Sequence, residues 1–102
     1  MGMCIPSGGV FDVYGPYRHN IDEVFGFVPN SRIDYYDEIT GKLLQRRWFD
    51  ADGNAVWDRD YDHNNSKGNH VFPHDHYWRH GYKKNRPEYK GENGELTNPN
   101  YC

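Results

Sequence analysis

The chain has 102 residues, of which 35% are hydrophobic, 17% aromatic and 26% charged. This length suits one small domain, and a net charge of -3 excludes a generally basic nucleic-acid-binding protein. Leu and Ala, which favour helices, are scarce, whereas aromatic residues and Gly are plentiful. We therefore expect a β-rich fold, α+β at most, rather than a helical bundle.

Two classes of protein are disfavoured by the lack of particular segments. The sequence has no apolar run of about 18 residues that would span a bilayer. Its first residues lack the basic and apolar regions of a signal peptide, so we expect a cytoplasmic protein. Cys4 and Cys102 are the only cysteines, which excludes a disulfide framework. We expect both thiols to be reduced, although a single bridge between them stays possible.

Residues 1–30 are rich in turn signals, including Ser7-Gly8-Gly9 and Gly15-Pro16. The run Ile21 to Phe25 favours at most one short helical turn, with Asn20 as its cap. We expect this loop-rich N-terminal segment to wrap over a core that the rest of the chain builds.

The strongest secondary-structure signal lies between Ser31 and His63, where two tight turns separate three β-rich runs. The runs are Ile33 to Asp37, Lys42 to Phe49 and Asn54 to Tyr61. The intervening turns, Glu38 to Gly41 and Asp50 to Gly53, each end in Gly, which tolerates the positive φ that tight hairpins need. This pattern predicts a three-stranded antiparallel meander.

Strand periodicity divides the third run into two faces, because alternate side chains of a strand point to opposite sides of the sheet. One face would carry Ala55, Trp57, Arg59, Tyr61 and His63, and the other Val56, Asp58, Asp60 and Asp62. We expect the aromatic face to pack on the core. The acidic face is then either a solvated sheet surface or a surface for a basic partner.

A fourth β-like run, Val71 to Trp78, contains Pro73 and is therefore expected to be an edge strand or an irregular extended segment. From Arg79 the chain turns basic and loses periodicity. We thus predict one domain, 1–102, with a loop-rich segment (1–30), a β-meander with a His cluster (31–78) and a basic segment and tail (79–102). The meander would have three to four strands joined by long loops.

Five of the six histidines fall within 18 residues. They are His63, His70, His74, His76 and His80. In an extended segment His74 and His76 point to the same side, at a spacing that lets two imidazoles bind one metal ion. His63 and His70 are the natural further ligands, and zinc is the metal that such a nitrogen-rich set favours. A bound zinc would also stabilise a core this small.

The sequence leaves open which residue completes the zinc site, and it allows two alternatives to a structural zinc. Asp62, Asp75 or Cys4 would complete or orient the ligands. Solvated surface histidines are the plain alternative to a metal site. A catalytic alternative is a His-Asn-His type nuclease, in which one His activates water and another holds a divalent ion. Pro73 argues against the helix that such nucleases place at their last His.

The remaining charged segments suggest binding surfaces. The acidic face, with Asp58, Asp60 and Asp62, would present negative charge to a basic groove of a protein partner. The basic stretch from Arg79 to Lys90 carries Tyr82 and Tyr89, a composition that would suit phosphate contacts and base stacking. We interpret it instead as a solvated tail, so that direct binding to nucleic acid is not expected.

Several motifs carry resemblances to known proteins. Tyr36-Asp37, Gly41, Leu43 and Arg46, followed by Asp50-x-Asp52-Gly53-Asn54, resemble the Tyr-Asp repeats of Rhs-type proteins, which are β-hairpins. A longer pattern contains Arg47-Trp48-Phe49-Asp50, Gly53, Ala55, Asp58, Asp60-Tyr61, His63, His70, Pro73-His74, His76 and Trp78. This pattern resembles small proteins of streptococcal and other Firmicutes prophages, and a toxin-tip domain of polymorphic toxin systems.

Among such prophage proteins the chain is similar to the zinc-containing type II-A anti-CRISPR proteins. This resemblance implies a phage-encoded inhibitor that blocks a CRISPR RNA-guided effector nuclease of the bacterial host by direct protein–protein binding, without catalytic residues. It also implies zinc ligation by His63, His70, His74 and His76, and a cytoplasmic location in the host cell. The toxin resemblance implies the alternative, a metal-dependent nuclease domain.

Overall fold

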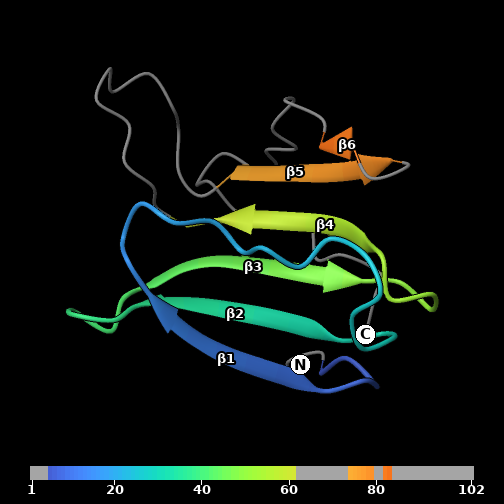
Figure 1. Ribbon diagram of the computed structural model, residues 1–102, viewed down its shortest axis with the longest axis horizontal. Coiled ribbons are helices and arrows are strands. Elements are labelled where there is room, and N and C mark those ends of the chain that lie inside the picture. The colour runs from blue at the N-terminus through green and yellow to red at the C-terminus, as the bar shows by residue number, and fades with distance from the viewer. Residues whose placement is uncertain (1–4, 62–73, 80–81, 84–102) are drawn as a thin grey trace, which may run out of the picture.

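The computed structural model describes residues 5–61, 74–79 and 82–83. In these ranges the chain forms strands that lie side by side in chain order (Figure 1) and contains no helix. The strands are β1 (Val10–Gly15), β2 (Arg32–Asp37), β3 (Leu43–Phe49), β4 (Ala55–Asp60), β5 (His74–Arg79) and β6 (Tyr82–Lys83). Strands β1 and β2 are parallel and the later neighbours are antiparallel, so β1 to β5 form a mixed sheet. The two residues of β6 pair only with the end of β5.

The predicted meander is confirmed by β2, β3 and β4. Both turns close as their chemistry indicates, with Gly41 at φ 75° and Gly53 at φ 79°. In the second turn the Asp50 carboxylate accepts hydrogen bonds from the backbone N–H groups of Asp52 and Asn54, each at 2.9 Å. The fourth run continues the meander, since β5 pairs with β4 from Trp57 to Asp60.

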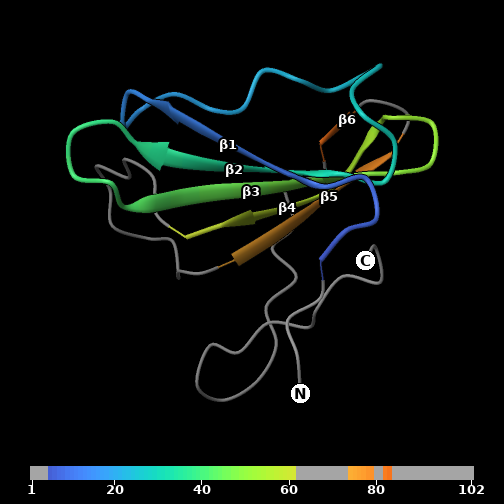
Figure 2. The ribbon, with the colours of Figure 1, turned by 90° about the horizontal axis from the view of Figure 1, so that it is seen from below.

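The N-terminal segment differs in part from the expectation. Residues 10–15 form strand β1, and Ile21 to Phe25 form no helical turn. The connection from β1 to β2, residues 16–31, is hereafter called the crossover segment. It lies across one face of the sheet without regular secondary structure (Figure 2), so the prediction that the N-terminal region wraps over the core is confirmed for these residues.

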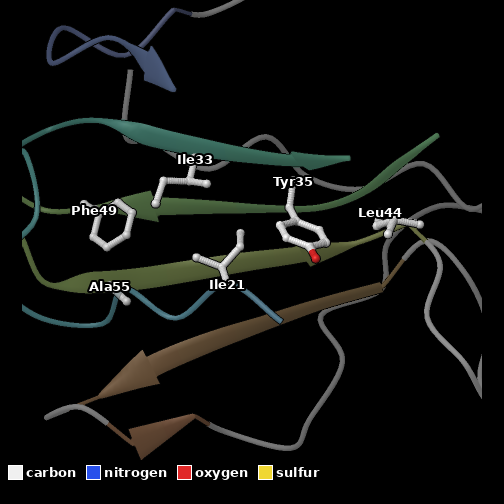
Figure 3. Close-up of a cluster of buried hydrophobic side chains, with 6 residues drawn as sticks. All are labelled: Ile21, Ile33, Tyr35, Leu44, Phe49 and Ala55. Carbon is white, nitrogen blue, oxygen red and sulfur yellow. The ribbon is translucent and has the colours of Figure 1, made fainter. Parts of the chain in front are cut away.

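The hydrophobic core lies between the sheet and the crossover segment. Its buried side chains are Ile21, Ile33, Tyr35, Leu44, Phe49 and Ala55 (Figure 3). Ile21 comes from the crossover segment and the others from three neighbouring strands. Val24 and Phe27 pack against the same cluster, and the Phe27 ring lies 4.8 Å from that of Phe49. A few large side chains thus supply the apolar area that the composition otherwise lacks.

A buried ion pair holds the crossover segment against the sheet. Arg47 is 2% exposed, and its Nε and Nη2 donate to the two carboxylate oxygens of Asp58 at 2.7 and 2.9 Å. Its Nη1 donates to the carbonyl oxygens of Ile21 and Glu23 at 2.7 and 2.9 Å. The guanidinium also lies 4.7 Å from the centroid of the Trp78 ring. One cation therefore joins β3, β4, β5 and the crossover segment.

Gln45 and three backbone hydrogen bonds complete this attachment. The Gln45 side chain accepts from the Ile21 N–H at 3.1 Å and donates to Asp58 at 3.3 Å. Backbone bonds of 2.7 to 3.0 Å join the crossover segment to β4 and its preceding turn. They run from Ala55 N–H to Val24, from Phe27 N–H to Gly53 and from Asn30 N–H to Asp50. These bonds satisfy backbone groups that a helical connection would pair internally.

The predicted faces of β4 are wrong. Asp58, which is 0% exposed, lies on the face covered by the crossover segment, together with Asp60, which is 5% exposed. The reason is a bulge: Phe49 pairs with Ala55 and Trp48 with Trp57, so Val56 has no opposite residue and the alternation shifts by one. Ala55 stays with the core, whereas Trp57 and Arg59 lie on the opposite face.

That opposite face consists largely of paired charges and aromatic rings. Arg59 binds Asp75 through two hydrogen bonds of 2.9 and 3.0 Å, and Trp57 donates to the same carboxylate at 2.8 Å. The Trp48 ring lies 5.7 Å from the guanidinium carbons of both Arg32 and Arg59. Burial lowers the pKa of Arg59, but the hydrogen bond and the charge of Asp75 outweigh this effect and raise it.

We predict that Arg47→Met lowers the free energy of unfolding by about 3–5 kcal/mol, because the buried Asp58 carboxylate loses its counterion. Chemical denaturation measures this difference. Arg18→Met is the matched control, since Arg18 is an exposed cation of the crossover segment, and it should change stability by less than about 0.5 kcal/mol. Equal stability of the two variants would contradict the assigned role of Arg47.

A second prediction compares two glycines with similar positive φ. At Gly41 an added Cβ meets nothing within 4 Å, whereas at Gly53 it overlaps the Phe27 carbonyl of the crossover segment. Gly41→Ala should cost about 1–2 kcal/mol, which is the penalty for a left-handed backbone. Gly53→Ala should cost about 1–3 kcal/mol more, because the crossover segment must move. Thermal unfolding of both variants tests this, and equal melting temperatures would show that the segment does not pack there.

Candidate functional site

The structure describes only part of the predicted zinc site. His63, His70 and Asp62 lie outside the described residues, as do Cys4 and Cys102. His74 and His76 both belong to β5, two positions apart, and pair with Asp60 and Asp58 respectively. Within the described residues no three His, Cys, Asp or Glu side chains come together in a way that would hold a metal ion. Zinc ligation by the four histidines stays a prediction.

His76 is the predicted ligand whose surroundings are visible. It is 8% exposed, and its Nε2 lies 3.5 Å from an Asp60 carboxylate oxygen. The imidazole therefore sits on the face covered by the crossover segment, near the end of β4 where His63 follows in the sequence. An imidazole nitrogen beside a carboxylate oxygen is a donor pair that zinc accepts. Within the described residues this pair is all that the predicted zinc site shows, and Asp60 stands where a carboxylate would orient His76.

Asp75, which the sequence suggested as a further member of the zinc site, does not belong to it. Its two carboxylate oxygens accept hydrogen bonds from Arg59 and Trp57. It alternates with His76 along β5 and so lies on the other face of the sheet. The suggestion that Asp75 completes or orients the ligands is therefore wrong, because Arg59 already neutralises this buried carboxylate.

The expected acidic docking surface is also corrected. Asp58 and Asp60 are buried, so they do not present a solvated face of negative charge to a partner. The bulge at Val56 places Arg47 directly opposite Asp58, and the turn residues Asp50 to Gly53 by themselves do not indicate this register. The third member of the predicted surface, Asp62, lies outside the described residues.

A different surface stands out, at the first strand of the sheet. Strand β1 forms one edge of the sheet (Figure 1) and pairs with β2 in unbroken register from Val10 to Gly15. Four of its side chains are large, hydrophobic and between 37% and 60% exposed: Val10, Phe11, Val13 and Tyr14. Exposed apolar edge strands are usually blocked by Lys, Pro or a bulge. In β1 the only charged residue is Asp12, and we call this strand the β1 edge.

Comparison of the chain with known protein families, with curated proteins and with solved structures finds no match. Among the described residues no helix is long and apolar enough to cross a bilayer. Two features of the described residues bear on function: the His76 and Asp60 pair on one face of the sheet and the apolar β1 edge at its side.

We predict that protein purified without a nickel column contains about one zinc per chain. His76→Ala should reduce the zinc content and lower the melting temperature, because a ligand and its contact with Asp60 are lost together. His19→Ala is the matched control: His19 is exposed, bonds Asp22 and should leave both quantities unchanged. Mass spectrometry of native protein and thermal unfolding provide the readouts, and wild-type protein without metal would contradict the zinc site.

Proposed function

We propose that this protein is a zinc-binding, phage-encoded inhibitor that binds a CRISPR RNA-guided effector nuclease of the bacterial host and blocks it by direct protein–protein contact. The observation that carries the binding part of this proposal is the β1 edge. A strand with four exposed apolar side chains, interrupted only by the charge of Asp12, leaves an apolar surface next to unpaired main-chain groups. In an inhibitor that binds the surface of another protein, such an exposed apolar strand would form part of the contact.

The rest of the described structure supports an inhibitor that acts by shape and charge. Its buried Arg and Asp side chains form ion pairs within the sheet, as Arg47 does with Asp58 and Arg59 with Asp75. Side chains held in such buried pairs contribute to the fold rather than to a reaction. The zinc, held by His63, His70, His74 and His76 in this proposal, has a structural role and stabilises the far end of the meander.

We predict that the purified protein binds a type II-A effector nuclease in a pull-down and inhibits its cleavage of target DNA in proportion to the amount added. The protein alone should degrade neither DNA nor RNA, because the proposal assigns it no catalytic residue. Both assays use the same zinc-loaded preparation, with heat-denatured protein as the control for non-specific effects.

One result would favour the alternative over this proposal. If the protein alone cleaves nucleic acid, and His63→Ala abolishes that cleavage while the fold is retained, then the chain is a metal-dependent nuclease domain of a polymorphic toxin system. His19→Ala serves as the control in that assay, since His19 lies on the crossover segment and is exposed.

A further inference from the structure

Backbone hydrogen bonds show which groups of the β1 edge face outward. In a parallel pair, alternate residues of one strand make both hydrogen bonds to its neighbour. The carbonyl oxygen of Gly9 accepts from Arg32 at 3.0 Å, and that of Gly15 accepts from Glu38 at 2.9 Å. The odd-numbered residues therefore bond β2, whereas Val10, Asp12 and Tyr14 direct their N–H and C=O groups away from the sheet. No strand of the described residues pairs with that side.

Apolar side chains lie on both faces of this edge. On the face of the crossover segment, the Phe11 ring packs edge to face against Phe27, with centroids 5.3 Å apart. On the opposite face, the Tyr14 ring stacks on Tyr36 at 5.0 Å. Each of these side chains is held by a neighbour and yet stays exposed, so that an added strand would find a preorganised apolar surface on either side.

Negative charge marks the centre of the edge. Asp12 is exposed, and no side chain of the described residues forms an ion pair with it. The nearby Asp34 is already paired with Arg32 and Arg46, at 2.6 and 3.2 Å, so these cations are committed to another carboxylate. Burial, together with the charges of Asp12 and Asp34, raises the pKa of Tyr36. Within the described part of β1 and β2, Asp12 is therefore a carboxylate that the neighbouring arginines do not neutralise.

This charge discriminates between possible occupants of the edge. Two copies of the chain pairing their β1 strands antiparallel over residues 10–14 would be centred on Asp12 and would place its carboxylate directly opposite its own copy. Like charges in that position are destabilising. A Lys or Arg in the same position gains an ion pair instead. The edge thus disfavours a second copy and favours a basic strand.

We propose that the β1 edge binds an extended segment of the partner protein as an additional antiparallel strand, with a Lys or Arg of that segment opposite Asp12 and apolar residues on either side of it. The main-chain groups of Val10, Asp12 and Tyr14 supply the hydrogen bonds and Asp12 supplies the selectivity. This inference rests on the proposed function, because it names the part of the inhibited nuclease that the protein would grasp.

Two labelled seven-residue peptides test the inference without the nuclease. They alternate Val and Thr and differ only in the central residue, which is Lys in one and Glu in the other. By fluorescence anisotropy the Lys peptide should bind wild-type protein about tenfold more tightly than the Glu peptide. Asp12→Lys should reverse this preference. Equal binding of both peptides, or binding of neither, would overturn the inference.

Proline at one position separates edge binding from a general loss of structure. Asp12→Pro removes an N–H group that points outward and should leave the pairing of β1 with β2 intact. It should weaken binding of the Lys peptide at least about tenfold with little change in melting temperature. Val13→Pro removes an inward N–H group and should lower the melting temperature. Asp12→Asn, which keeps the N–H group, should lose the preference for Lys but still bind.

The same variants, tested on the effector nuclease, separate the two proposals. If wild-type protein inhibits the nuclease and Asp12→Pro inhibits equally well, the edge inference is wrong and the proposed function stands. If the peptides bind as expected but the protein binds no effector nuclease, the proposed function is wrong, whereas the inference that the β1 edge binds a basic strand is retained. A dimer of the wild-type protein that Asp12→Pro converts to a monomer would overturn the inference, because a second copy would then occupy the edge.

Discussion

The structure depends most on the ion pair between Arg47 and Asp58. A connection of 16 residues without regular secondary structure carries many backbone groups that need partners, and Arg47 satisfies two of its carbonyl oxygens while neutralising a buried carboxylate. Without this pair the part of the crossover segment around Ile21 and Glu23 would lose its two hydrogen bonds from Arg47 and would cover the core less firmly. The crossover segment runs back along one face of the sheet, so that β2 starts at the same end as β1 and the two strands are parallel (Figure 2).

Charge and aromatic rings together take the place of missing aliphatic volume. On one face Arg47 lies over Trp78, and on the other Trp48 lies between Arg32 and Arg59. Each guanidinium brings a long apolar stem and a flat cation that packs against a ring, so these side chains contribute both packing and pairing. A chain with few Leu and Ala residues builds a small protein by burying matched ions between large rings, and the register of the meander provides the match.

Local chemistry predicted the meander well, because Gly41 and Gly53 end turns whose geometry depends on neighbouring residues alone. Simple alternation could not predict the faces of β4, because the bulge at Val56 exchanges the two faces for all later residues of the strand. No residue type in β4 indicates this bulge. Strand β1 was not predicted for another reason. The whole crossover segment separates it from its partner β2 in the sequence, and parallel strands are not joined by a tight turn with recognisable residues. For the candidate site, the sequence predicted that His74 and His76 share one face of a strand. The contact between His76 and Asp60 could be found only from the pairing of β5 with β4.

The attachment of the crossover segment also implies an order of assembly. Arg47 and Gln45, two side chains that hold the crossover segment, lie on β3 and both bond Asp58 of β4. They are therefore in place once the β3–β4 hairpin forms, and the contacts of that hairpin are local in sequence. The pairing of β1 with β2 requires closure of a much longer loop, whose entropic cost the crossover contacts repay. The meander should thus form first and β1 last. The strand that we assign to binding then belongs to the part of the molecule that opens most easily, and a bound partner strand would raise its protection against hydrogen exchange towards that of the meander.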